Sequence, residues 1–294
     1  MRKTKISIGR IILNAVMIII CLGYILPILL MISISFSSEK SITDFGYQLI
    51  PNMWSTDAYK MIFKNPYQIL NAYKVTIAYT ALSTVLSIIV QTLMAYPLSR
   101  SNYNKKQFIT VYLMITMFFG GGLVPSYILN TQYLHLGNTF WIYIFPALTS
   151  AWNVVLFKTF FKGLPEGLVE AAKLDGASEF MVYRRIILPL STPIIACVAF
   201  TTVLGKWNDW NTSLLYIRRS DLYSLQYLLQ RIINEADYIK NIQGTTAGAL
   251  VGEELPAETM RYAMAILAAG PMMIVFPFFQ KYFAKGLVVG SVKG

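Results

Sequence analysis

The chain has 294 residues, of which 55% are hydrophobic and only 13% are charged. Its mean hydropathy is +0.52, which is typical of an integral membrane protein and excludes an ordinary soluble domain. The formal net charge of +11 does not indicate nucleic-acid binding, because the basic residues form short clusters beside apolar runs rather than one continuous stripe.

Apolar segments long enough to cross a bilayer, which takes roughly 20 residues, recur along the whole chain. The first follows a basic N-terminus and is longer than the roughly 7–15 apolar residues of a signal peptide, so we interpret it as a retained transmembrane helix. The sequence predicts an all-α fold with six spans in a single domain, 1–294. We expect these spans at 11–36, 75–98, 108–130, 140–161, 191–216 and 260–283.

The lysines and arginines predict the orientation of the spans. Fifteen lie in the segments on the side of the N-terminus and nine lie in the segments on the other side. Because cytoplasmic loops carry the excess of Lys and Arg, we expect both termini and the polar stretch 163–190 in the cytoplasm. The longest polar segments, 37–73 and 217–259, then face outward.

Residues that commonly carry chemistry are scarce. Cys21 and Cys197 fall inside apolar runs, which favours buried small side chains over a disulfide or a metal site. His135 is the only histidine, so we expect no metal, cofactor or catalytic centre. The triplet Gly120–Gly122 lacks the Lys and Ser/Thr of a phosphate-binding loop. It is either a packing notch between helices or a local break that faces a cavity.

The stretch 163–190 is the longest charged segment between two apolar runs. Its apolar residues recur at three- and four-residue steps, Pro165 fits the first turn of a helix, and Gly176 interrupts the pattern. The sequence therefore predicts two short helices with a turn at Gly176. They either form a docking surface or lie as amphipathic helices on the membrane surface.

The spacing within this stretch is specific. Glu170-Ala171-Ala172 is followed after three residues by Gly176 and after nine more by Ile186, Leu188 and Pro189. This pattern resembles the cytoplasmic signature loop of ABC importer permeases, and its flanking residues resemble the carbohydrate branch typified by the G subunit of the maltose importer. The resemblance implies a coupling-helix hairpin that binds the ATPase through Glu170, Ala171, Ala172, Leu174, Asp175, Gly176, Ala177 and Pro189.

The same resemblance implies the function and the partners. The chain would be a permease subunit of an ATP-driven, binding-protein-dependent importer of oligosaccharides in the bacterial cytoplasmic membrane. Its partners would be a second homologous permease subunit, two ATPase subunits that bind ATP and Mg, an extracytoplasmic sugar-binding protein, and membrane lipid. The run 119–125 is similar to permeases of polysaccharide and uronate-oligosaccharide importers, which extends the substrate class to acidic sugars.

An ion-coupled secondary transporter without an ATPase is the alternative. Such a transporter needs acidic residues inside its spans, and Asp209 is the only acidic residue inside a predicted span. The alternative is therefore the weaker hypothesis.

A polar and aromatic group near the outer end of the fifth span is the candidate sugar pathway. Aromatic faces and amide or carboxylate groups suit a sugar, but tryptophans at this depth also form ordinary interfacial belts. Lys206 and Asp209, three residues apart, are within pairing reach on a helix. The pathway candidates are Trp207, Asn208, Asp209, Trp210, Asn211 and Phe119.

Two further segments are candidate contact surfaces. The C-terminal residues Gly290, Ser291 and Lys293 resemble the extension by which G-type subunits reach the ATPases, although the lysine is also a plain positive-inside anchor. The outer segment 217–259 is either a docking surface for the binding protein or an ordered loop without partners.

Overall fold

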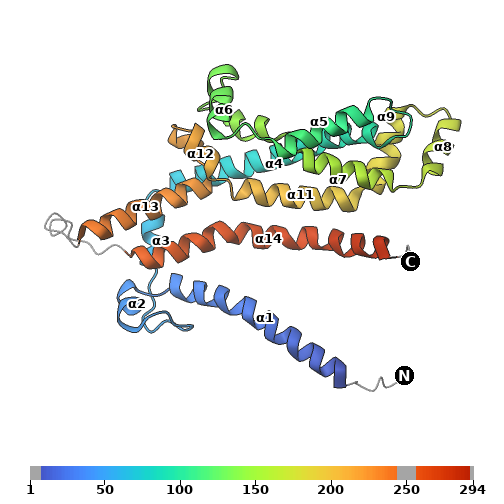
Figure 1. Ribbon diagram of the computed structural model, residues 1–294. Coiled ribbons are helices and arrows are strands. Elements are labelled where there is room, and N and C mark those ends of the chain that lie inside the picture. The colour runs from blue at the N-terminus through green and yellow to red at the C-terminus, as the bar shows by residue number, and fades with distance from the viewer. Residues whose placement is uncertain (1–7, 244–255, 292–294) are drawn as a thin grey trace. The chain divides into compact units, whose positions relative to one another are not determined.

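The computed structural model describes residues 8–243 and 256–291, which are helical with short connections (Figure 1). Within these residues the only β-type pairing is an isolated bridge between Ser37 and Trp54. The all-α prediction is therefore confirmed for the described part of the chain. The contacts divide the chain into two compact units, residues 1–66 with 229–271, and residues 67–228 with 272–294. Each unit is described by itself.

The first unit begins with α1 (Ile8–Ser35), a 28-residue helix that continues through Pro27. Its buried residues are confined to Ser33–Ser35 at the C-terminal end. An apolar helix with exposed side chains all round requires an apolar solvent, and lipid supplies it. Two short helices, α2 (Glu39–Phe45) and α3 (Asp57–Ile62), follow in the polar segment 37–73.

A carboxylate joins α2 to the start of α14 (Ala257–Ser291). Glu39 accepts hydrogen bonds from the backbone N–H groups of Glu258 at 3.0 Å and Thr259 at 3.1 Å. These N–H groups belong to the first turn of α14, where helical donors have no partner within the helix. The negative charge also complements the positive end of the helix dipole.

The predicted outer loop 217–259 contains a helix that the sequence analysis did not predict, α13 (Leu225–Gln243). Its buried residues Leu225, Leu228, Leu229 and Ala236 recur at helical spacing, and Arg231 pairs with Glu235 at 2.7 Å one turn away. The polar residues that suggested a loop therefore form the exposed face of an amphipathic helix. Both α13 and α14 begin in one unit and end in the other.

Three helices are long and apolar enough to cross a membrane, and three bent pairs of helices bring the total to six if each pair is one span. The long helices are α1, α4 (Pro66–Ser99) and residues 257–281 of α14. The bent pairs are Lys106–Phe118 with Leu123–Tyr133 at 111°, Phe140–Ala147 with Ala151–Lys162 at 48°, and Glu179–Leu190 with Thr192–Trp207 at 76°.

The predicted fifth span, 191–216, is not one helix. The helix α11 (Thr192–Trp207) ends after 16 residues, and α12 (Asn211–Tyr216) starts after a short break. Asp209 explains the break, because its carboxylate accepts hydrogen bonds from the backbone N–H of Thr212 at 3.0 Å and from its hydroxyl at 2.6 Å. A carboxylate that bonds the first turn of the next helix in this way satisfies a free N–H group there and favours a new helix start over continuation of the preceding one.

The third predicted span, 108–130, is interrupted where the sequence indicated. The helix α5 (Lys106–Phe118) ends before the glycine triplet, and α6 (Leu123–Ile128) follows it. Gly122 has a φ of 83°, a left-handed conformation that a glycine adopts without strain. The glycines therefore act as a break in the span, and a π-helical turn, η1 (Leu129–Tyr133), continues the segment.

The largest core of the second unit lies where α4, α5, α7 (Ala151–Lys162) and α11 meet the polar stretch 163–190. Fully buried members are Phe157, Phe161, Val182 and Ile187. Figure 1 shows α8 (Glu166–Leu174) and α9 (Glu179–Val182) at one end of α4, α5, α7 and α11, and α6 and α12 toward their other end. Within this unit, the two candidate sites therefore lie at opposite ends of the helices.

Candidate functional site

The polar stretch 163–190 forms two short helices around a turn at Gly176, as the sequence predicts. At the end of α8, the N–H of Ala177 donates to the carbonyl of Ala172 at 2.9 Å, and the N–H of Gly176 donates to that of Lys173 at 3.0 Å. Gly176 has a φ of 81°. This pair of bonds around a left-handed glycine is a Schellman motif, which ends a helix and reverses the chain.

The hairpin has an inner and an outer face. Val169 is buried, and Ala172 and Ala177 pack against the same core of the second unit. On the outer face Leu174 is 90% exposed and Phe180 is 62% exposed. An apolar side chain held so far out of the core contributes little to the fold, and exposed apolar groups of this kind mark binding surfaces.

Polar contacts fix the hairpin to α4. Glu179 accepts a hydrogen bond from the hydroxyl of Tyr96 at 2.6 Å and forms an ion pair with Lys173 at 2.5 Å. The hydroxyls of Thr92 and Tyr183 lie 2.9 Å apart in a buried contact, and Ser178 caps α9 by accepting from the N–H of Met181. These contacts could not be predicted from the sequence, because Tyr96 and Thr92 lie 83 and 91 positions away from their partners.

The predicted coupling residues share this hairpin but differ in exposure. Glu170 and Ala171 lie on the exposed side of α8, and Glu170 forms no ion pair with a basic residue of the described chain. Asp175 is the exposed C-cap residue of α8. Pro189 is exposed in the short helix α10 (Leu188–Leu190), which follows a π-helical turn, η4 (Tyr183–Ile187), and leads into α11.

The predicted sugar group lies at the break between α11 and α12. Trp207 is only 2% exposed and therefore belongs to the packed interior, whereas Trp210 is 46% exposed. Asn208 and Asn211 are exposed, and the amide of Asn208 bonds the Leu204 carbonyl at 2.9 Å. The group is thus divided, with one tryptophan for packing and one tryptophan plus two amides open to solvent.

Lys206 and Asp209 have different partners in the structure. Lys206 Nζ donates to the backbone carbonyl of Tyr143 at 2.8 Å, and the Lys206 carbonyl accepts from the hydroxyl of Tyr79 at 2.9 Å. The rings of Tyr79 and Tyr143 are stacked with centroids 4.3 Å apart. Asp209 bonds Thr212 instead. The lysine thus ties the end of α11 to two earlier segments.

The connection after α12 carries a further ion pair. The guanidinium of Arg219 donates through two nitrogens to the carboxylate of Asp221, and this bonding holds the pKa of Asp221 below its ordinary value. The backbone carbonyl of Asp221 in turn accepts from the Asn71 amide at 2.6 Å. These contacts fix the connection to the start of α4.

The remaining predicted residues lie elsewhere. Phe119 is 77% exposed at the end of α5, in the glycine break rather than at the break after α11. Gly290 and Ser291 are the last residues of α14, and Lys293 lies outside the described residues. Among residues 8–243 and 256–291 there is no group of three or more His, Cys, Asp or Glu side chains that could hold a metal ion.

Comparison with known proteins identifies the family of this chain. Residues 4–289 match the family model described as "Binding-protein-dependent transport system inner membrane component". The chain belongs to this family. As a family member it is an inner membrane component of a transport system, which accounts for the apolar helices and favours the importer over the ion-coupled transporter.

Several curated relatives of this family member are named as permease proteins of transport systems for polysaccharides or oligosaccharides. Protein LplC of Bacillus subtilis is 34% identical over 92% of this chain and 90% of its own length. The polygalacturonan/rhamnogalacturonan transport system permease protein YtcP of the same organism is 33% identical over 92% of this chain and 93% of its own.

A solved structure has the same fold. One chain of a bacterial ABC transporter involved in the import of the acidic polysaccharide alginate matches with a TM-score of 0.78 and 27% identity. The match covers 96% of this family member and 100% of that chain. The relatives and the structure together support the prediction that this is a carbohydrate importer permease.

Proposed function

We propose that this chain is the permease subunit of an ATP-driven importer of oligosaccharides and that the hairpin 163–190 transmits the work of ATP to it. It acts as one domain beside a second, homologous permease subunit, with two ATPase subunits that bind ATP and Mg and an extracytoplasmic sugar-binding protein. The chain itself supplies no catalytic group. The observation that supports this role is that the hairpin exposes its outer face while its inner face is part of the core.

The mechanism follows from how the hairpin is attached. Leu174 and Phe180 offer apolar contacts to a groove on the ATPase, and the Schellman turn lets the backbone approach closely. The ion pair of Glu179 and its bond to Tyr96 connect the docked surface to α4. Movement of the ATPases is thereby passed to the helices, which alternately open the pathway outward and inward.

A substitution at Leu174 tests the docking. Leu174→Asp places a charge on a side chain that is 90% exposed, so the permease should fold normally but lose its ATPase on tagged purification. Leu134→Asp makes the same change at an exposed residue of the opposite, outer side and should retain the ATPase. Co-purification of the ATPase with the Leu174 variant at the wild-type ratio would contradict the proposal.

We infer acidic, polysaccharide-derived oligosaccharides as the substrate class. Support comes from the names of the relatives, one of which transports polygalacturonan/rhamnogalacturonan, and from the alginate importer. The exposed Trp210, Asn208 and Asn211 give one aromatic face and two amides for sugar hydroxyls.

Uptake by cells that lack the native permease tests the substrate class and the pathway together. Wild-type permease should import labelled oligogalacturonate in preference to a neutral maltooligosaccharide of equal length. Trp210→Ala should lower uptake about 2- to 10-fold, because an aromatic stacking contact worth roughly 0.5–1.5 kcal/mol is lost from an exposed position, while membrane abundance stays unchanged. Trp207→Ala should lower abundance instead, since Trp207 is buried. Equal import of both sugars would refute the substrate class.

A further inference from the structure

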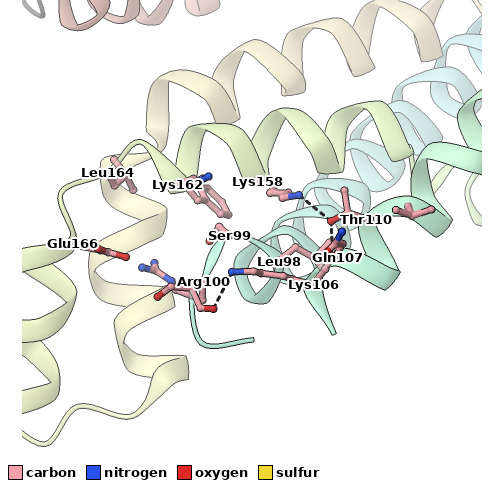
Figure 2. A pocket seen from close by; sticks show the side chains of 13 residues that line it. Leu98, Ser99, Arg100, Lys106, Gln107, Thr110, Lys158, Lys162, Leu164 and Glu166 are labelled. Carbon is pink, nitrogen blue, oxygen red and sulfur yellow. Dashed lines mark hydrogen bonds between the residues drawn. The ribbon is translucent and has the colours of Figure 1, made fainter. Parts of the chain in front are cut away.

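A cavity of about 530 Å³ lies where the ends of α4, α5 and α7 meet. Four cationic side chains line it, Arg100 directly after α4, Lys106 at the start of α5, and Lys158 and Lys162 from α7, with a single carboxylate, Glu166. Figure 2 shows the two lysines of α7 facing Lys106 and Arg100 across the cavity. Like charges gathered in one concavity repel one another, and this arrangement favours a bound anion.

The cations of this cavity form no ion pair within the described residues, although the Glu179 carboxylate interacts electrostatically with Arg100. Lys158 Nζ donates to the Thr110 hydroxyl at 2.9 Å, and Lys106 Nζ donates to the Ser101 carbonyl at 2.9 Å. These are neutral acceptors, and within residues 8–243 and 256–291 none of the four cations forms an ion pair with a carboxylate. The charge of the cavity is therefore available to a ligand.

Arg100 gives the sharpest indication. Its guanidinium carbon lies 4.7 Å from the centroid of the Tyr96 ring, which holds the side chain in place. Within the described residues, its Nε and Nη2 atoms are buried and have no hydrogen-bond partner, although the side chain also interacts with the Tyr96 hydroxyl. Buried charged donors without an acceptor are costly, and the planar guanidinium is suited to bind a phosphate through two parallel hydrogen bonds.

The apolar lining of the cavity favours a phosphate that carries acyl chains over free phosphate. Leu98 and Phe161 are buried in its floor, and Val111 is 48% exposed one turn along α5 from the basic residues. The three helices belong to segments that cross the membrane by length and composition. A ligand whose phosphate is attached to a glycerol and acyl chains satisfies both the cations and this apolar side, whereas free phosphate satisfies only the cations.

We propose that this cavity is a binding site for the phosphate headgroup of an anionic phospholipid. The headgroup phosphate binds Arg100, Lys158 and Lys162, and the acyl chains leave along α5 past Val111. The site depends only on these helices crossing the membrane, not on the transported sugar. It is separate from the outer face of the hairpin, because Leu174 and Phe180 do not line it.

Equilibrium binding to the purified, delipidated complex carrying the full chain tests the site. The probe is a fluorescent phosphatidylglycerol, and the competitors are unlabelled phosphatidylglycerol, phosphatidylcholine of equal chain length, and inorganic phosphate. We expect competition by phosphatidylglycerol alone. Equal competition by phosphatidylcholine would refute an anionic site, and equal competition by inorganic phosphate would show that the ligand is free phosphate rather than lipid.

Variants locate the binding. Lys162→Gln alters an exposed side chain and should weaken binding about fivefold, and Lys158→Gln with Lys162→Gln about 25-fold, which corresponds to about 1 kcal/mol for each cation. Glu166→Gln should strengthen binding, because it removes the only carboxylate of the lining. Unfolding temperatures without lipid report whether each variant is folded.

The matched control is Lys105→Gln, which removes an exposed charge beside the cavity from a residue that does not line it. This variant should bind the lipid as the wild type does. If Lys105→Gln weakens binding as much as Lys162→Gln, the lipid responds to general surface charge and the proposed site is wrong. If Glu166→Gln leaves the affinity unchanged, the headgroup does not enter this cavity.

Discussion

Gly176 forms the turn on which the outer face of the hairpin depends. Its φ of 81° lies in the left-handed region, and a Cβ built on it would meet no atom within 4 Å. The requirement for glycine here is therefore conformational rather than steric inside the subunit. The open space around it leaves room for another protein.

Gly176→Ala should destabilise the hairpin by about 1 kcal/mol, since a residue with a Cβ is strained at this φ. Gly176→Asn should cost less, because asparagine tolerates the left-handed region. Hydrogen exchange of the α8 and α9 amides measures the change.

Gly167→Ala is the matched control within α8. Gly167 has no positive φ and an open environment, so alanine there should be neutral or slightly stabilising. A loss of protection in Gly167→Ala equal to that in Gly176→Ala would show that the backbone conformation is not the cause.

At the level of elements, the hairpin depends on the core beneath it. The π-helical turn η4 carries Ile187, which is fully buried, beside Ile186, which is only partly buried. The side chain that enters the core thus lies next to one at its margin. The stability of the hairpin comes from the inner residue.

Ile187→Ala should lower the free energy of unfolding by about 2–5 kcal/mol, because it leaves a cavity in the core. Ile186→Ala removes the same atoms from the margin and should cost clearly less. Thermal unfolding of both variants in detergent measures the difference. Equal losses would mean that the core does not hold the hairpin.

The sequence predicted best those features of the fold that depend on residues close together in the chain. The turn at Gly176 and the break at Gly120–Gly122 follow from the conformational freedom of glycine; the turn was predicted, and the break was one of two alternatives that the sequence left open. The end of α11 was not predicted, although Asp209 bonds Thr212 only three residues away and an Asp at the start of a helix is a local signal; the apolar residues on both sides favoured one continuous span. The helix α13 was missed because its polar face dominates its composition.

Contacts between distant residues could not be predicted from this one sequence. The bond from Tyr96 to Glu179 joins residues 83 positions apart, and each looks ordinary in its own segment. The same holds for the basic cavity, whose cations looked like positive-inside anchors until three helix ends brought them together. Packing, not local pattern, creates these sites.

At the scale of the whole molecule, the orientation in the membrane is the main prediction. In a background with Cys21 and Cys197 replaced by serine and alanine, Ser220→Cys should react with a membrane-impermeant maleimide added to intact cells. Ser178→Cys should react only after the cells are opened, because the charge count predicts that the hairpin faces the cytoplasm. Both positions are exposed. Labelling of Ser178→Cys in intact cells would reverse the topology.

The bonds of Lys206 also bear on the order of membrane assembly. A lysine inside an apolar span opposes insertion by about 2.5–3.5 kcal/mol at the centre of the bilayer and by less near its ends. The ammonium of Lys206 donates to the Tyr143 carbonyl, and the backbone carbonyl of Lys206 accepts from the Tyr79 hydroxyl; both partners belong to earlier segments of the chain. Since synthesis proceeds from the N-terminus, both partners are already in the membrane when α11 arrives, and the segment with the least favourable charge enters last among the three.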